Sequence, residues 1–168
     1  MHDLPRTVDQ LVARLNMQPH PEGGYYSETY RAVDQVRRVS DDALRASSTA
    51  IYYLLSDGAR SAWHRIASDE VWHFYAGAPL NVYVLGDDGR LVIHTLGNAL
   101  THPQCTYQAV VPAGCWFAAS LENPDSYALV GCTVAPGFEF AEFELADTAQ
   151  LLAAYPQHAE TIRLLARR

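Results

Sequence analysis

His64 and Glu70 are the two ionisable residues whose types and spacing best suit chemistry. Side chains on a β-strand alternate between its two faces, so the residues around them predict two strands joined by a turn at 67–69. If these strands pair, His64, Ile66 and Glu70 face the same interior. An imidazole and a carboxylate there suit an acid/base pair or a metal site. We predict His64 as a catalytic base and Glu70 as its orienter or a second acid/base group; the alternative is a satisfied structural pair.

Aromatic residues close to this pair predict the wall of a ligand pocket. Trp72 and Phe74 share the strand face of Glu70, and Phe117 is expected to join them. In a regular strand His73 points the other way, so it binds ligand only if a bulge breaks the alternation. Burial among aromatic rings would raise the pKa of Glu70 unless His64 or a metal compensates its charge.

The same stretch resembles the first signature of the cupin superfamily, which reads glycine, five residues, histidine, one residue, histidine, three residues, glutamate, six residues, glycine. Gly58, His64, Glu70 and Gly77 occupy the corresponding positions. Ile66 stands where that signature has its second histidine, so one of the usual metal ligands is replaced.

The second cupin signature reads proline, one residue, glycine, two residues, histidine, and residues 112–117 are similar to it. Phe117 occupies the histidine position, so two of the four usual metal ligands are missing. The resemblance therefore implies no firmly bound metal cofactor. His64 and Glu70 would form only a partial site, and a weakly bound divalent metal remains the alternative.

The segments 20–25, 63–65, 68–73, 111–114 and 130–138 together resemble a family of small RmlC-like cupins known as a domain of unknown function. This resemblance implies an all-β fold, a double-stranded β-helix or jelly roll. Cupins include sugar epimerases, which motivates a small polar metabolite in the barrel and an isomerase- or epimerase-like proton transfer. The alternatives are a non-catalytic metabolite-binding or sensing protein and, third, a metal-dependent oxygenase, because one fold serves many functions.

The pattern along the chain agrees with this fold. We expect one domain over 1–168, with a core barrel at about 20–145 and helical spacing at 7–16 and 148–165. Many short strand-like runs predict a sandwich or barrel. Residues 34–46 are expected to form a surface loop with a helical turn at 41–45, and 137–145 an extended segment. The strand-like runs lie at 25–33, 48–55, 61–66, 71–75, 80–85, 91–95, 108–111, 115–119 and 127–135.

Composition and charge limit the classes of binding partner that we expect. The net charge of -7 disfavours nucleic acid and anionic membranes. Three cysteines without paired spacing suggest reduced thiols, and the first residues lack the apolar region of a secretory signal, so we expect a cytoplasmic protein. We also expect a homodimer, because the aromatic run at 25–33, an outward-facing Trp63 and the segment 138–143 offer much apolar surface.

Overall fold

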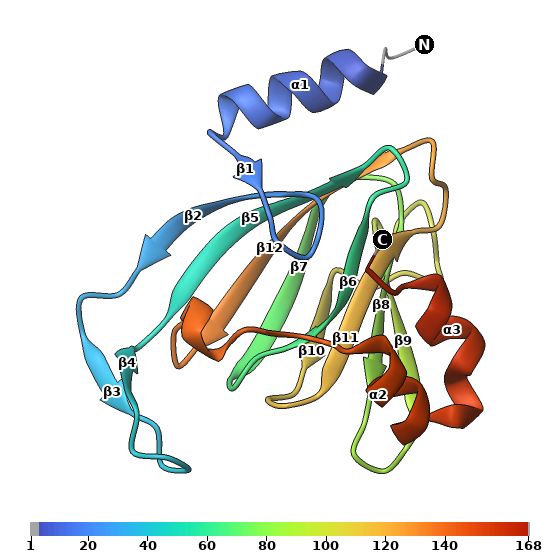
Figure 1. The fold of residues 1–168 in the computed structure, drawn as a ribbon. Coiled ribbons are helices and arrows are strands. Elements are labelled where there is room, and N and C mark those ends of the chain that lie inside the picture. Colours follow the sequence, from blue (N-terminus) through green and yellow to red (C-terminus); the bar gives the residue numbers. More distant parts are fainter. Residues whose placement is uncertain (1–3, 168) are drawn as a thin grey trace.

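The computed structural model describes residues 4–167 and contains two antiparallel β-sheets that face each other, with short helices outside them (Figure 1). One sheet has six strands in the order β1-β2-β5-β12-β7-β10. They are β1 (Gln18–Pro19), β2 (Tyr25–Arg31), β5 (Thr49–Ser56), β12 (Tyr127–Ala135), β7 (Asp69–Gly77) and β10 (Gln108–Val111).

The second sheet has five strands in the order β13-β6-β11-β8-β9. They are β13 (Glu144–Leu145), β6 (Arg60–Arg65), β11 (Trp116–Leu121), β8 (Leu80–Leu85) and β9 (Leu91–Leu96). The predicted strand runs between 48 and 135 correspond to β5 through β12, and no helix interrupts them. The mostly-β sandwich expected from the sequence is therefore confirmed.

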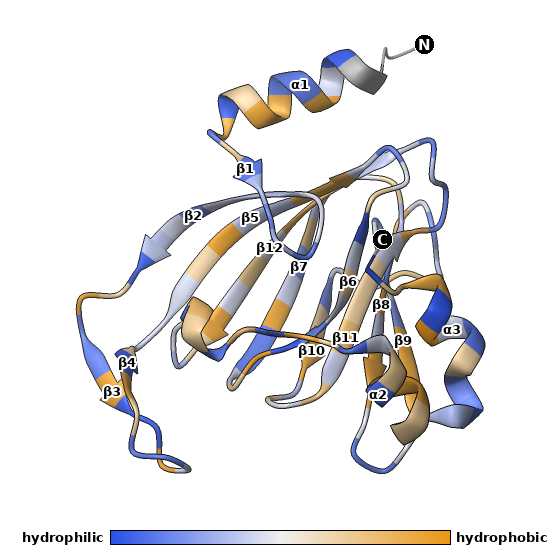
Figure 2. Ribbon diagram, viewed as in Figure 1, coloured by the Kyte–Doolittle hydropathy of each residue, from blue (hydrophilic) through white to orange (hydrophobic). Residues whose placement is uncertain are grey.

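The main core lies between the two sheets. Hydrophobic residues are frequent along β5 and β12 (Figure 2), and both strands are buried on both faces: Leu55 and Val130 belong to the main core, whereas Leu54 and Leu129 pack on the opposite face. The interior side chains include Tyr53, Trp72, Val82, Phe117 and Val130, each at most 1% exposed. This packing holds the strands that carry the site residues in a fixed register.

Helix α1 (Leu4–Arg14) lies across one end of the six-stranded sheet (Figure 1), where Val8 packs in a cluster with Leu54 and Leu129. No helix in the described part of the chain is long and apolar enough to cross a membrane. Helices α2 (Thr148–Ala154) and α3 (Ala159–Leu164) pack beside the five-stranded sheet.

The C-terminal helices correct one sequence-based expectation. Trp63 points away from the face of His64, as strand alternation predicts, but its side chain is not a free surface for a subunit contact. It is buried against Leu151, Ile162 and Leu165, and its indole N–H donates to the backbone carbonyl of Ile162 at 3.2 Å. The chain's own helices cover this residue, so Trp63 cannot support the predicted dimer.

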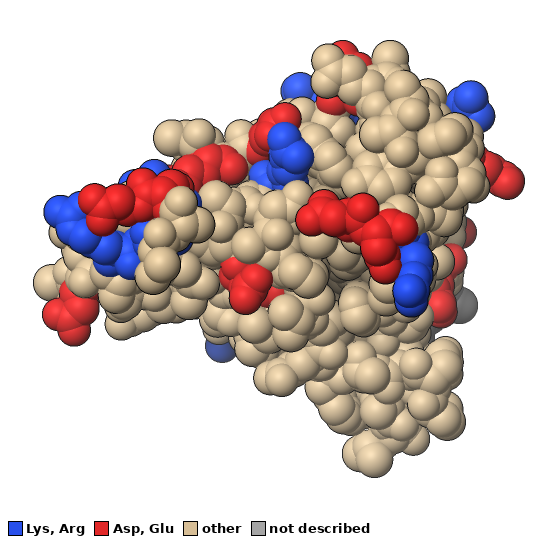
Figure 3. Space-filling model, turned by 90° about the horizontal axis from the view of Figure 1, so that it is seen from below, with Lys and Arg blue, Asp and Glu red and all other residues tan. Residues whose placement is uncertain are grey.

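Residues 34–46 give a second correction, because they form a hairpin and not a loop with a helical turn. Strands β3 (Gln35–Arg37) and β4 (Leu44–Ala46) pair and project from the body of the molecule (Figure 1). The tip bends at Asp42, which has a left-handed φ of 57°, a conformation that ends helical geometry. Basic and acidic side chains lie side by side over this projection (Figure 3).

Residues 137–145 are only partly extended. A 3-10 helix at Phe140–Glu142 precedes the two-residue strand β13, which pairs with β6 beside His64. We call residues 138–143 the aromatic flap, because they carry Phe138, Phe140 and Phe143. The flap lies against the opening between the two sheets, and its three rings face a cavity there.

Candidate functional site

A cavity of about 270 Å³ opens along the inner face of the six-stranded sheet. Three of its buried ionisable residues come from separate elements: Glu22 from the turn after β1, His64 from β6 and Glu70 from the start of β7. Most of the remaining wall is apolar. The complete lining is Gln18, His20, Glu22, Tyr26, Glu28, Thr49, Ile51, Tyr53, His64, Ile66, Glu70, Cys132, Val134, Phe138, Phe140 and Phe143.

Two glycines let the turn at 20–24 reach the interior. Gly23 has a φ of 115°, and a Cβ atom there would lie 2.0 Å from the carbonyl oxygen of Arg60. Gly24 also has a positive φ and lies close to the backbone of β5. Only glycine fits such a left-handed, crowded backbone. The hydroxyl of Tyr53 donates to the carbonyl of Gly23 at 2.6 Å and fixes the turn, so that His20 and Glu22 enter the cavity wall.

Both ring nitrogens of His64 are engaged. Nδ1 lies 2.7 Å from the carbonyl oxygen of Ala62, which can only accept, so this nitrogen carries a proton. Nε2 lies 2.6 Å from Oε2 of Glu22, an ion-pair distance between two side chains that are 4% and 6% exposed. In the described structure that carboxylate oxygen has no hydrogen bond of good geometry. The contact between the two side chains is therefore mainly an electrostatic attraction.

Glu22 and His64 stabilise each other as an ion pair. Burial lowers the pKa of His64, but the charge and hydrogen-bonding capacity of Glu22 outweigh burial, so the pKa is raised overall. Burial likewise raises the pKa of Glu22, yet His64 more than compensates and the pKa is lowered. Both shifts favour an imidazolium paired with a carboxylate over the neutral pair.

Glu70 is a buried carboxyl group without a comparable partner. Its residue is 8% exposed, and burial raises its pKa to about 7, although the charge of His64 opposes this rise. The nearby charge of Glu22 raises the pKa further, and the thiol of Cys132 donates toward the carboxylate and lowers it slightly. Glu70 therefore exchanges a proton near neutral pH, which is the range for general acid/base work.

Comparisons with known proteins identify the family. Residues 9–146 match the family described as Cupin superfamily (DUF985). The chain belongs to this family. A protein of known structure from Shewanella oneidensis is 38% identical, with a TM-score of 0.84 over 95% of this chain and 96% of that one.

Other similar proteins agree with that assignment. A hypothetical protein from Leishmania major is 34% identical, with a TM-score of 0.85 over 95% of this chain and 98% of that one. An uncharacterized protein from Saccharomyces cerevisiae is 28% identical over 84% of this chain and 76% of its own length. Oxalate decarboxylase from Bacillus subtilis is 16% identical, with a TM-score of 0.55 over 88% of this chain and 36% of that one, which shows a shared cupin fold alone.

The metal centre typical of cupins does not fit the residues of this cupin. Ile66 lines the cavity and Phe117 packs against His64, and neither side chain offers a donor atom. Both nitrogens of His64 already have partners. Within residues 4–167, no group of three or more His, Cys, Asp or Glu side chains is arranged to hold a metal ion. We therefore derive no chemical step through a metal.

The structure brings together only part of the predicted site. His64 and Glu70 line one cavity. Phe117 and Trp72 are buried behind it: the Phe117 ring centroid is 4.0 Å from that of His64, and Trp72 contacts Tyr53 edge-to-face.

Phe74 and His73 also lie away from the cavity lining. Phe74 packs against the main core. The bulge in β7 follows Phe74, where the register with β12 shifts, so it leaves His73 on the outer face of the sheet. There Nε2 of His73 lies 2.9 Å from the Thr133 hydroxyl, and Gln108 donates to Nδ1 at 3.1 Å.

Sequence reasoning missed Glu22, His20 and the rings of the aromatic flap. The sequence assigns His20 no role, but its side chain is 7% exposed, and burial lowers its pKa, which favours the neutral ring. The backbone N–H of Glu22 donates to Nδ1 of His20 at 3.1 Å. The signal available in the sequence was the glycine pair that follows Glu22, since adjacent glycines mark a turn that can approach other backbone closely.

Proposed function

We propose that this protein binds a small polar metabolite in the cavity and catalyses an isomerase- or epimerase-like proton transfer at a carbon atom. The observation that carries the proposal is Glu70, whose carboxyl group faces the cavity with a pKa of about 7. A carboxylate of this kind is a stronger base than an exposed one and is still deprotonated in a large fraction of molecules at neutral pH.

The roles differ from those assigned on sequence alone. His64 is a poor base, because Nδ1 donates to Ala62 and Nε2 faces the Glu22 carboxylate with its own proton. In the proposal Glu70 removes the proton from a carbon next to a carbonyl or imine group, and the electron pair of that C–H bond moves onto the neighbouring oxygen or nitrogen. The imidazolium of His64 stabilises the negative charge by attraction. Glu70 then returns a proton to carbon.

The test does not require the substrate to be known. Protein and a small-molecule cell extract are incubated in D₂O, and mass spectrometry then searches for a metabolite that gains deuterium. We expect one such metabolite with the wild-type protein and with Glu160→Gln, whose side chain lies on helix α3 outside the cavity lining, but not with Glu70→Gln. Equal deuterium uptake with the wild-type protein and with Glu70→Gln would refute the role assigned to Glu70.

A second candidate is a non-catalytic cupin that binds or senses the metabolite. Ile66 and Phe117 favour it, because they replace two ligands of the catalytic metal in the cupin signatures. This candidate predicts a small molecule that copurifies with the protein and acquires no deuterium from it. Deuterium uptake that depends on Glu70 would decide against it.

A further inference from the structure

We infer that the cavity selects compact, uncharged or cationic nitrogen-containing ring molecules with N–H donors, and rejects phosphorylated or carboxylated ones. This inference rests on the proposed function in taking the same cavity as the ligand site, but it concerns charge and shape and not the reaction. It combines three observations: the charges of the lining, the positions of the nearby arginines and the arrangement of the aromatic rings.

The lining offers no free cation for an anionic ligand. Within the described residues 4–167, no arginine contributes to it, and the whole sequence contains no lysine. His64 is paired with Glu22, and Glu28 is paired with Arg31. Glu70 remains as a lining carboxylate without its own cationic partner. A phosphate or carboxylate would lose its hydration and face this negative charge, which is unfavourable.

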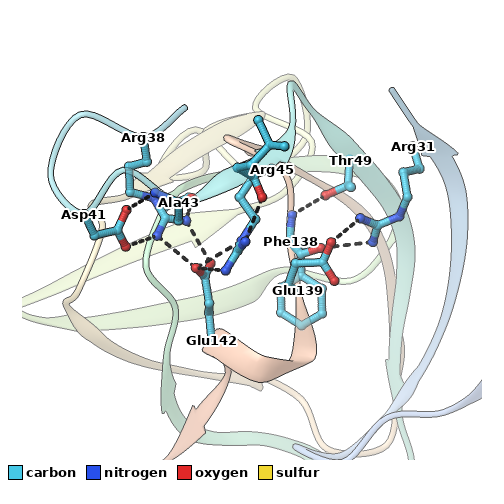
Figure 4. Close-up of polar contacts among 11 residues, drawn as sticks. Arg31, Arg38, Asp41, Ala43, Arg45, Thr49, Phe138, Glu139 and Glu142 are labelled. Carbon is cyan, nitrogen blue, oxygen red and sulfur yellow. Dashed lines mark hydrogen bonds and ion pairs between the residues drawn. The ribbon is translucent and has the colours of Figure 1, made fainter. Parts of the chain in front are cut away.

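Three arginines hold the aromatic flap in place. Figure 4 shows Arg38 and Arg45, from the β3–β4 hairpin, converging on Glu142, and their shortest contacts are 2.8 and 2.6 Å. On the other side, Arg31 contacts Glu139 at 3.0 Å and donates to the carbonyl of Phe138 at 2.9 Å (Figure 4). Most of their donors bind carboxylates or the Phe138 carbonyl, and none of the three arginines lines the cavity, so they are not placed to bind a ligand anion.

The anchored flap forms an aromatic wall of the cavity. The rings of Phe138 and Phe140 meet edge-to-face, with their centroids 4.9 Å apart. The Phe140 centroid is also 6.2 Å from that of Phe143 and 6.3 Å from that of Tyr26 on β2. Aromatic faces attract cations and stack on flat rings.

Glu70 supplies a polar anchor in the same cavity. Among the described residues only the thiol of Cys132 donates to its carboxylate. Lone pairs therefore remain for N–H donors of a ligand. A cavity of about 270 Å³ suits a molecule of one or two rings.

Three probes of nearly equal shape test the charge preference: benzamidine, a planar cation with several N–H donors, benzamide, which is neutral, and benzoate, an anion. Isothermal titration calorimetry at about pH 8 keeps Glu70 ionised. We expect benzamidine to bind about tenfold more tightly than benzamide, because one modest charge contact with Glu70 is enough for that ratio. Benzoate should show no binding. Benzoate binding as tightly as benzamidine would overturn the inference.

Two variants locate the binding. Glu70→Gln should weaken benzamidine binding about tenfold and benzamide binding much less, because only the charge is removed. Phe140→Ala should weaken both several-fold; Phe140 is 49% exposed, so its truncation leaves the core intact. Glu160→Gln, on helix α3 and outside the cavity lining, is the matched control and should change neither. Benzamidine binding that neither Glu70→Gln nor Phe140→Ala alters would refute the inferred site.

The two proposals can fail separately. If no metabolite gains deuterium but the probes keep the order benzamidine, benzamide, benzoate, the charge selection stands and the proton transfer is wrong. If a phosphorylated or carboxylated metabolite gains deuterium in a Glu70-dependent manner, the proton transfer stands and this inference is overturned.

Discussion

Glu70 and Glu142 are both carboxylates of low exposure close to the same cavity, and their surroundings give them opposite properties. Glu142 lies on the outer side of the aromatic flap between two arginines, whose hydrogen bonds lower its pKa to about 2. Glu70 lies inside with an imidazolium already paired to another carboxylate, and burial raises its pKa to about 7. One carboxylate is permanently charged and structural, whereas the other is free to exchange a proton.

The comparison shows how the chain separates stability from reactivity. Arginine side chains gather outside the cavity (Figure 4), where they hold the flap, and none of the described arginines lines the cavity. A carboxylate with two guanidinium partners gains charge-assisted hydrogen bonds but loses its use as a base. Leaving Glu70 without such a partner costs stability and keeps its pKa near neutral, a pattern common at functional sites.

The largest expected effect is on the rate of proton transfer, and it tests the role of Glu70. Glu70→Gln should lower the initial rate of deuterium uptake by at least about a hundredfold, because general acid/base groups contribute that much or more. Glu142→Gln should lower it by less than about tenfold, since Glu142 acts only through the flap. Circular dichroism should show both variants folded. Similar losses in the two variants would remove the distinction between the two carboxylates.

The pH dependence of stability should follow the raised pKa of Glu70. The folded protein holds this proton up to a pKa of about 7, and the unfolded chain only to about 4.5. Stability linked to Glu70 is therefore complete below about pH 4.5 and is lost as the pH rises through about 7. Between about pH 5 and 8, the free energy of unfolding should fall by up to about 3 kcal/mol more in wild type than in Glu70→Gln.

Urea denaturation at several pH values measures this difference. Glu142→Gln is the control: its wild-type pKa of about 2 means that its linked stability is lost only as the pH falls below about 4.5. Its slope between pH 5 and 8 should therefore match that of wild type. A wild-type slope equal to that of Glu70→Gln would show that Glu70 titrates normally.

Glu142→Gln should destabilise the fold at neutral pH by about 2 kcal/mol, between the values for exposed and buried ion pairs. The variant leaves Arg38, whose side chain is 8% exposed, with Asp41 as its remaining ionic partner. Glu139→Gln, in the same flap but with a side chain 45% exposed, should cost less than about 1 kcal/mol. Chemical denaturation of both variants gives the comparison, and equal losses would contradict it.

The narrowest expected effect is a change in the titration of a single group, His64, in the variant Glu22→Gln. Without the carboxylate charge, burial dominates and the pKa of His64 should fall relative to wild type. NMR titration of the imidazole C–H signals measures the shift. Glu28→Gln, at the same cavity but paired with Arg31, should leave the His64 titration unchanged. An unchanged pKa in Glu22→Gln would mean that Glu22 does not hold the His64 proton.

The sequence by itself determined the strands and the faces of the residues on them. Alternation of period two is a local property, and it placed His64 and Glu70 on interior faces and Trp63 on the opposite face. The glycine and proline turns between the runs marked where strands end. For the same reason the sequence located the replaced ligand positions Ile66 and Phe117, because the cupin signatures are defined by spacing alone.

Only the tertiary structure decided the partners of those residues. Glu22 reaches His64 because the turn at Gly23 folds back against β6, and nothing in the local pattern encodes that approach. The cover over Trp63 likewise depends on how the C-terminal helices return to the sheet. Periodicity assigns a side chain to a face, but the pKa of a buried group depends on which distant segments desolvate it and which charges they bring. The packed fold therefore decides which carboxylate is a structural anchor and which is a base.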